Sequence, residues 1–124
     1  MSDDRHYPHP VEIEAYGAGG FRFAGMSHRG SILALPSGIW PWPPRSVAEL
    51  NEASFTRVVA EKSTIDIFLI GCGLEPVLLP APLRTGLREA GLSFDVMPTR
   101  AAASTYNVLF GEGRRVAAAL IAVE

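Results

Sequence analysis

The chain has 124 residues, a formal net charge of -2 and a pI of about 5.9. A chain of this length can form one domain whose core needs no disulfide or metal. Its charge argues against a nucleic-acid partner, because such a domain carries a basic surface, and its single cysteine, Cys72, excludes an internal disulfide and fits a reducing compartment.

The N-terminal residues predict an arm rather than a targeting signal. Met1 to Pro10 is acidic and proline-containing, without the charged-then-apolar pattern of a signal peptide. The longest apolar run, Val116–Val123, is too short to cross a membrane. We therefore expect a cytoplasmic protein without membrane insertion, with residues 1–10 as a disordered arm and residues 11–124 as a single α/β domain.

Short antiparallel strands are predicted in the first half of the chain. Val11–Ala15 alternates apolar and acidic residues, which is the period of a half-buried strand. Phe21–Phe23 and Ser31–Leu35 are the next two strands, with a turn at Gly25–Gly30 between them. Ile39–Pro44 contains alternating prolines that cannot donate to a ladder, so it is an edge strand or an extended polyproline-like segment.

The second half alternates strands with helices, which predicts an α/β fold with largely parallel pairing and right-handed crossovers. Ile65–Ile70 is an apolar strand that ends in a glycine turn, and Val116–Val123 is apolar on both faces, as a covered central strand is. Ser46–Glu49 matches a capping box. The remaining elements are a helix near Glu52–Glu61, a helix from Pro82 to Gly91, a strand at Leu92–Met97 and a helix that Thr99 can cap.

Gly71-Cys72-Gly73 follows a buried strand, as a nucleotide-binding turn would. The fingerprint fails, because Pro76 stands where the third glycine is needed. A tight turn is the favoured interpretation. Cys72 could act as a nucleophile, but a small buried cysteine is the favoured alternative, since no local motif supplies a base.

The histidines do not predict a metal site. His6 and His9 lie beside two aspartates in the arm, and His28 is the third histidine of the chain. A metal site needs three or four ligands in a fixed geometry. No pattern in the sequence predicts a catalytic residue, a cofactor or a metal ligand set.

A polar constellation is the better candidate for a ligand site. Glu75 and Thr99-Arg100 follow the ends of two strands expected to be neighbours, so a cleft there would hold an acid, a cation and a helix N-terminus. The structural alternative is that Thr99 caps its helix, Tyr106 packs with its hydroxyl bonded, Asn107 bonds a backbone turn and Arg100 pairs with Glu75.

Two further sets of residues leave alternatives open. Arg114 and Arg115 join this cleft only if the last strand runs antiparallel to its neighbours, and otherwise lie at the opposite edge. Trp40 and Trp42 form an aromatic edge with the surrounding prolines. If exposed, this edge is a partner-binding surface; if buried, the tryptophans close the sheet against a helix.

Several segments together resemble one family, and they are Gly71-Cys72-Gly73, Leu83–Gly91, Asp95–Leu109 and Glu112–Leu120. They are similar to the family of small α/β domains of unknown function that includes the mitochondrial respiratory complex I assembly factor 3 and the adipogenesis-associated domain-containing protein. The resemblance implies three layers: a central mixed sheet with one antiparallel strand, flanked by helices on one side and by a small antiparallel β layer from the N-terminal half. It also implies that Arg114 and Arg115 lie near the Gly71–Gly73 turn.

The resemblance implies no catalytic residues, and the better-understood members act through protein contacts during respiratory complex assembly. We therefore predict a non-enzymatic interaction protein, with partners such as respiratory complex subunits and contacts at Trp40, Trp42 and the Arg100/Arg115 region. The alternative is a small-molecule or anion-binding protein, or an enzyme, that uses a cleft at Gly71–Glu75 and Thr99–Arg100. A third possibility is homo-oligomerisation through the edge strand near Trp40.

Overall fold

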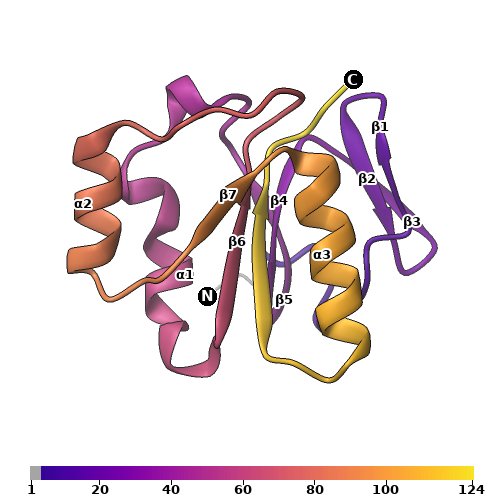
Figure 1. The fold of residues 1–124 in the computed structure, drawn as a ribbon. Coiled ribbons are helices and arrows are strands. Elements are labelled where there is room, and N and C mark those ends of the chain that lie inside the picture. The colour runs from indigo at the N-terminus through magenta and orange to yellow at the C-terminus, as the bar shows by residue number, and fades with distance from the viewer. Residues whose placement is uncertain (1–3) are drawn as a thin grey trace.

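The computed structural model describes residues 4–124, which form two β-sheets and three α-helices (Figure 1). The large sheet contains β4 (Ser31–Leu35), β5 (Gly38–Trp42), β6 (Ile67–Gly71), β7 (Asp95–Met97) and β8 (Val116–Leu120). The small sheet contains β1 (Ala15–Gly17), β2 (Gly20–Phe23) and β3 (Met26–Arg29). The helices are α1 (Thr56–Ala60), α2 (Ala81–Glu89) and α3 (Thr99–Gly111), with 3-10 turns at Val47–Glu49, Glu52–Phe55 and Lys62–Thr64.

The large sheet is mixed, with the strand order β5-β4-β8-β6-β7. β8, β6 and β7 run parallel to one another, whereas β4 is antiparallel to both of its neighbours. The predicted mixed sheet with one antiparallel strand is therefore confirmed, but that strand is β4 and not the last strand, which runs parallel to β6. β8 is the central strand and all five of its residues are buried, as its continuous apolar sequence predicts.

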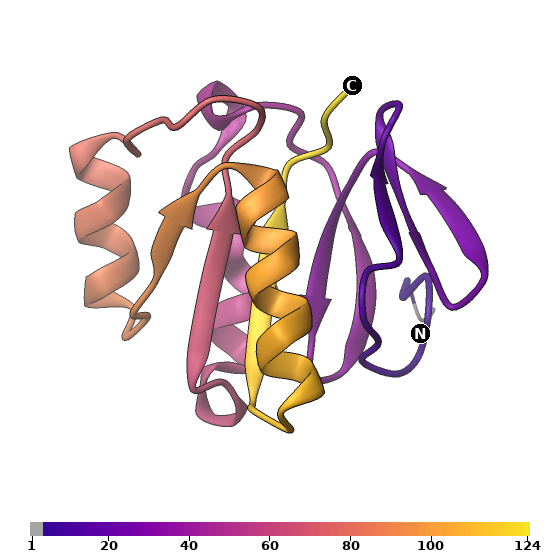
Figure 2. The ribbon, with the colours of Figure 1, turned by 45° about the vertical axis from the view of Figure 1, so that its right-hand side comes forward.

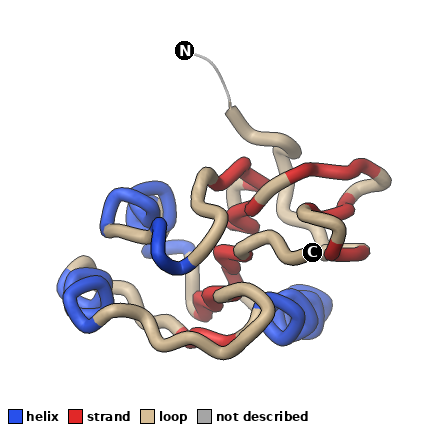
Figure 3. The backbone as a smooth tube through the Cα atoms, turned by 90° about the horizontal axis from the view of Figure 1, so that it is seen from above, coloured by secondary structure: helices blue, strands red, loops and turns tan. Residues whose placement is uncertain are grey.

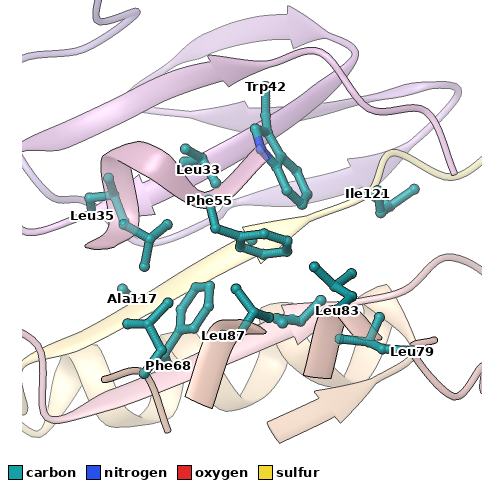
Figure 4. Close-up of a cluster of buried hydrophobic side chains, with 14 residues drawn as sticks. Leu33, Leu35, Trp42, Phe55, Phe68, Leu79, Leu83, Leu87, Ala117 and Ile121 are labelled. Atoms are coloured by element: carbon teal, nitrogen blue, oxygen red, sulfur yellow. The ribbon is translucent and has the colours of Figure 1, made fainter. Parts of the chain in front are cut away.

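One face of the large sheet packs against α1, α2 and the 3-10 turns. Bulky side chains fill this layer, and Figure 4 shows Phe55 at its centre, between Trp42 and Leu87. Phe55 is edge-on to the rings of Trp42 and Phe68, with centroids 5.6 and 6.2 Å apart. This packing explains why the short segment around Phe55 holds a helical conformation: its stability comes from burial rather than from its length.

The opposite face is covered by α3 and by the small sheet (Figure 2). Ala102 and Ala103 are buried there, and their small side chains let α3 lie close to Ala118 and Leu120 of β8. Helices therefore lie on both sides of the large sheet, as the view from above shows (Figure 3). The expectation of helices on one side alone is corrected in this detail.

The direction of the crossovers explains this arrangement. The chain moves from β6 outward to β7 through α2, and then back across β6 to β8 through α3. Because both connections are expected to be right-handed, opposite directions of travel place the two helices on opposite faces. Within residues 4–124, no helix has both the length and the apolar character needed to span a bilayer.

The first half differs from prediction in three places. Gly25–Gly30 is not simply a turn, because Met26–Arg29 forms β3. The first strand is shifted to Ala15–Gly17, at the end of the predicted segment. Ser46 makes no side-chain cap, and a capping box forms instead at Asn51, whose amide oxygen accepts from the Ser54 N–H at 3.2 Å.

The N-terminal segment lies against β5, the edge strand of the large sheet. Residues 1–3 of the predicted arm lie outside the described residues. From Asp4 onward the chain has a defined path: the N–H groups of His6 and Tyr7 donate to the Ile39 carbonyl at 2.8 and 3.2 Å, and the Ile39 N–H donates to the Tyr7 carbonyl at 2.9 Å. The structure differs here from the predicted disordered arm. Pro41, two residues after Ile39 in β5, has no N–H that could donate to a further strand.

Candidate functional site

The parallel strands β6, β7 and β8 end at one edge of the large sheet, and Thr99 joins them there. Thr99 is completely buried. Its hydroxyl donates to the Ile121 carbonyl at 2.7 Å and accepts from the Gly73 N–H at 3.0 Å, while its own N–H donates to the Gly73 carbonyl at 2.9 Å. The prediction that Thr99 caps α3 is therefore wrong, because its hydroxyl bonds neighbouring segments instead.

The glycine turn after β6 is shaped by a close approach to α3. A Cβ added at Gly71 would lie 2.9 Å from the Cα of Thr99, so a side chain there would force the segments apart. Gly73 has φ +109°, which other residues rarely adopt. Between them, Cys72 is buried and its thiol donates to the Glu75 carbonyl at 3.3 Å. The tight-turn interpretation and the buried cysteine fit this geometry.

Glu75 and Arg100 line one cavity at this edge, with a volume of about 460 Å³. Its wall also includes the hairpin residue Tyr16, Pro98 before α3 and the last residue, Glu124. Within residues 4–124, neither Glu75 nor Arg100 has an ion-pair partner, so the alternative in which these two side chains pair is wrong. The structure therefore brings together the acid and the cation of the predicted constellation and leaves both accessible.

Tyr106 and Asn107 do not belong to this cavity. Tyr106 is 1% exposed, and its hydroxyl donates to the Val11 carbonyl at 2.9 Å. Burial raises the pKa of Tyr106 well above its usual range, so it stays neutral. Asn107 donates to the Ile13 carbonyl at 2.7 Å and accepts from the Ile13 N–H at 2.8 Å. Both side chains attach residues 11–13 to α3, so Tyr106 packs with its hydroxyl bonded as the structural alternative predicts, while Asn107 bonds an extended segment rather than a turn.

Arg115 lies at the opposite edge of the sheet. Because β8 is parallel to β6, Val116 faces Ile67 where both strands begin. At this end of the strands, Arg115 donates to both carboxylate oxygens of Asp66, from Nε at 3.0 Å and from Nη2 at 2.7 Å. This pairing lowers the pKa of Asp66 and raises that of Arg115. The expectation that Arg114 and Arg115 lie near the Gly71–Gly73 turn is wrong.

The two tryptophans separate in the structure. Trp42 is buried, and its indole N–H donates to the Ser54 carbonyl at 2.7 Å, so it closes the sheet against the helical layer. Trp40 is half-buried: its N–H donates to the Ser37 hydroxyl at 2.8 Å, and the guanidinium carbon of Arg57 lies 3.4 Å from its ring centroid. Of the two alternatives, burial holds for Trp42, whereas Trp40 is partly covered by contacts within the chain.

An exposed apolar loop was not predicted. Leu74, Val77 and Leu78, between β6 and α2, are 67%, 42% and 74% exposed. They border a second cavity, of about 770 Å³, which Glu75 and Glu124 also line. We call Leu74, Glu75, Val77, Leu78 and Arg100 the carboxyl-edge surface.

A signal for the loop is present in the sequence. Val77-Leu78-Leu79 stands between Pro76 and Pro80, which prevent a regular helix or strand across it. An apolar segment that forms neither a helix nor a strand buries only some of its side chains. Leu79 alone of the three residues is buried, at 1% exposure.

Fold and site together define a small α/β domain whose open edge carries apolar side chains and unpaired charges. The chain belongs to the family described as "Protein of unknown function (DUF498/DUF598)", which it matches over residues 13–121. This family assignment agrees with the resemblance seen in the sequence.

Three proteins illustrate the relationship. An uncharacterised protein of Rhodobacter capsulatus is 38% identical over 111 residues, which is 90% of this chain and 84% of that protein. NADH dehydrogenase (ubiquinone) 1 alpha subcomplex assembly factor 3 of Mus musculus is 30% identical over 115 residues, 93% of this chain but 62% of its own length. The crystal structure of an outer membrane protein from Bartonella henselae is 48% identical, with a TM-score of 0.89 over 96% of this chain and all of that one.

Proposed function

We propose that this chain is a non-enzymatic factor that binds a protein during assembly of a respiratory complex. The carboxyl-edge surface is the observation that carries the proposal. Leu78 is 74% exposed and Leu74 is 67% exposed on the same loop. Clustered apolar side chains at a surface are typical of protein contact sites. The name of the mouse relative supports NADH dehydrogenase as the complex concerned.

The occupant that fits this surface is an apolar segment of a respiratory complex subunit or assembly intermediate, flanked by charged residues. Leu74, Val77 and Leu78 offer the apolar contact. Glu75 and Arg100 lack ion-pair partners within the described residues, so a partner would supply their counter-charges. A cytoplasmic location is part of the proposal and rests on the single cysteine.

Affinity capture from the protein's own cells, followed by mass spectrometry, tests this function. Respiratory complex subunits should be recovered with the wild-type chain and lost with a Leu74→Ser/Leu78→Ser variant. Val108→Ser is the matched control, because Val108 is 61% exposed on α3 outside this surface. Equal recovery with all three chains would remove the surface from the proposal. Recovery of no subunit, with normal complex content in a deletion strain, would overturn the function.

A second candidate is the binding of a small anionic molecule in the 460 Å³ cavity. The shared lining by Glu75 and Arg100 favours it, while the burial of Tyr106 and the distant position of Arg115 take these two side chains out of the cleft. Thermal-shift screening against anionic metabolites tests it. A stabilisation that Arg100→Gln abolishes supports this function, and no stabilisation by any of them rejects it.

A further inference from the structure

The side chains of His6 and His28 meet between the N-terminal segment and the small sheet. Their Nδ1 atoms are 3.1 Å apart, and their rings cross at 89° with centroids 4.9 Å apart. His6 also packs edge-on against Phe23, which is fully buried. The histidine pair therefore links a segment on β5 to strand β3.

The chemistry of this contact limits its charge. A hydrogen bond between two imidazole Nδ1 atoms needs one of them to donate and the other to accept, and an accepting nitrogen carries no proton. The pair can therefore hold with no positive charge or with one. If both rings are protonated, two N–H groups face each other at this distance and two cations repel.

We propose that His6 and His28 form a pH-sensitive latch, which holds the N-terminal segment Arg5–Pro8 against β5 at neutral pH and releases it in acid. Backbone hydrogen bonds and the Arg5 side chain make the rest of the contact. Ile39 exchanges hydrogen bonds with Tyr7, and Arg5 donates to the Ser37 carbonyl at 3.0 Å. Release would free both the N–H and the C=O of Ile39 at the edge of the large sheet.

The surroundings of His28 set the direction of the response. Burial, and then the nearby charge of His6, lower the pKa of His28, while a backbone hydrogen bond at Ser31 raises it in part. A histidine whose pKa is lowered by folding favours the folded contact above about pH 6.5 and opposes it as the pH falls through the lowered value. The other charged groups on neighbouring segments are Asp4, Arg5, His9, Glu14, Arg22 and Arg29.

Five of these groups, all but Asp4, have another contact or face in another direction. Arg22 and Arg29 alternate with Phe21 and His28 along their strands, so they point to the other face of the small sheet. The guanidinium of Arg5 donates to Ser37, and His9 packs on Tyr7 with ring centroids 5.8 Å apart. Glu14 pairs with Arg22 at 3.7 Å.

Hydrogen exchange of the Ile39 amide tests the latch, because its N–H donates to Tyr7 only while the segment is held. The protection factor should fall by up to about tenfold for each pH unit between the usual histidine pKa of about 6.5 and the lowered pKa of His28, the slope of one linked proton, and should level off below that pKa. The Ile70 amide in β6 reports global unfolding and should keep its protection. His28→Gln should remove the pH dependence at Ile39, whereas His9→Gln should leave it as in the wild-type chain. An unchanged slope in His28→Gln, or a flat wild-type profile, would overturn the latch.

A second measurement decides the case in which His28→Gln loosens the segment at every pH. The pKa of His28, followed by NMR through its ring proton, should rise toward the usual value of about 6.5 in His6→Gln, because the repelling neighbour is gone. A pKa of His28 that is the same with and without His6 would refute the coupling.

Discussion

Each end of the parallel strands carries an arginine, but the two ends use it differently. Where β6 and β8 begin, both carboxylate oxygens of Asp66 accept hydrogen bonds from Arg115. Where the strands end, Arg100 and Glu75 line one cavity without pairing, together with the exposed Leu74. At the first end Arg115 and Asp66 satisfy each other, and at the second end Arg100, Glu75 and exposed apolar side chains have no such pairing within the described residues. The two ends therefore differ in the pairing of their charges, and the proposed binding surface lies at the end where Arg100 and Glu75 have no ion pair among the described residues.

Thr99→Val should have the largest effect on stability, because it removes the hydrogen bonds that join three segments beneath the carboxyl-edge surface. The valine leaves the Ile121 carbonyl and the Gly73 N–H without the hydroxyl that bonds both. We expect the free energy of unfolding to fall by about 2–4 kcal/mol, the cost of two unsatisfied backbone groups. Urea unfolding measures it. Thr99→Ser keeps the hydroxyl and is the control; an equal loss in both variants would contradict this role.

Gly71→Ala tests the close approach of β6 and α3 at the same end. The added Cβ would lie 2.9 Å from the Thr99 Cα and 3.0 Å from Leu120 Cδ2, so backbone must move. A loss of about 1–3 kcal/mol in the free energy of unfolding is expected for such overpacking. Gly111→Ala provides the comparison, since nothing lies within 4 Å of a Cβ there. Thermal unfolding that ranks the two variants equally would argue against the close contact.

Arg115→Gln should have a smaller effect, and one that depends on pH and salt. Arg115 lowers the pKa of Asp66, so the pair stabilises the fold above the ordinary aspartate pKa of about 3.9, and that contribution is lost as the pH falls through the lowered value. The difference in unfolding free energy between wild type and variant should shrink in acid and in about 1 M salt, which screens exposed charges. A difference that persists under both conditions would assign it to packing.

Leu78→Ser should change stability least, although it should weaken the proposed protein contact most directly. The side chain is 74% exposed, so its removal should alter the free energy of unfolding by no more than about 0.5 kcal/mol. Chemical denaturation checks this directly. Leu79→Ser, one residue along the chain, serves as the buried counterpart and should be strongly destabilising. If the two substitutions cost the same, the loop is not arranged as described.

Strands with continuous apolar sequences were the most predictable part of the fold. Val116–Leu120 and Ile67–Gly71 could be predicted because both of their faces are covered, which leaves an unbroken apolar pattern. Met26–Arg29 could not, because it belongs to a small sheet at the surface and its Met-Ser-His-Arg sequence lacks an apolar period. Its backbone pairing with β2, rather than an apolar period in its own sequence, makes this segment a strand.

The candidate site was predictable in position but not in the roles of its residues. Glu75 and Arg100 follow strand ends, and parallel strands bring such residues to one edge. The role of Thr99 depended on Ile121 and Gly73, which are distant in sequence and contact it only in the fold. The place of Arg115 depended on the direction of β8, which strand composition does not encode.

Pro41 places a residue without an N–H in the outermost strand on one side of the large sheet. The outermost strand on the other side, Asp95–Met97, is three residues long. Among the described residues, neither side of the large sheet therefore offers a long row of unpaired backbone groups onto which another chain could add. This termination of the sheet opposes growth of a fibre by strand addition, although Leu74 and Leu78 lie exposed at the ends of the parallel strands.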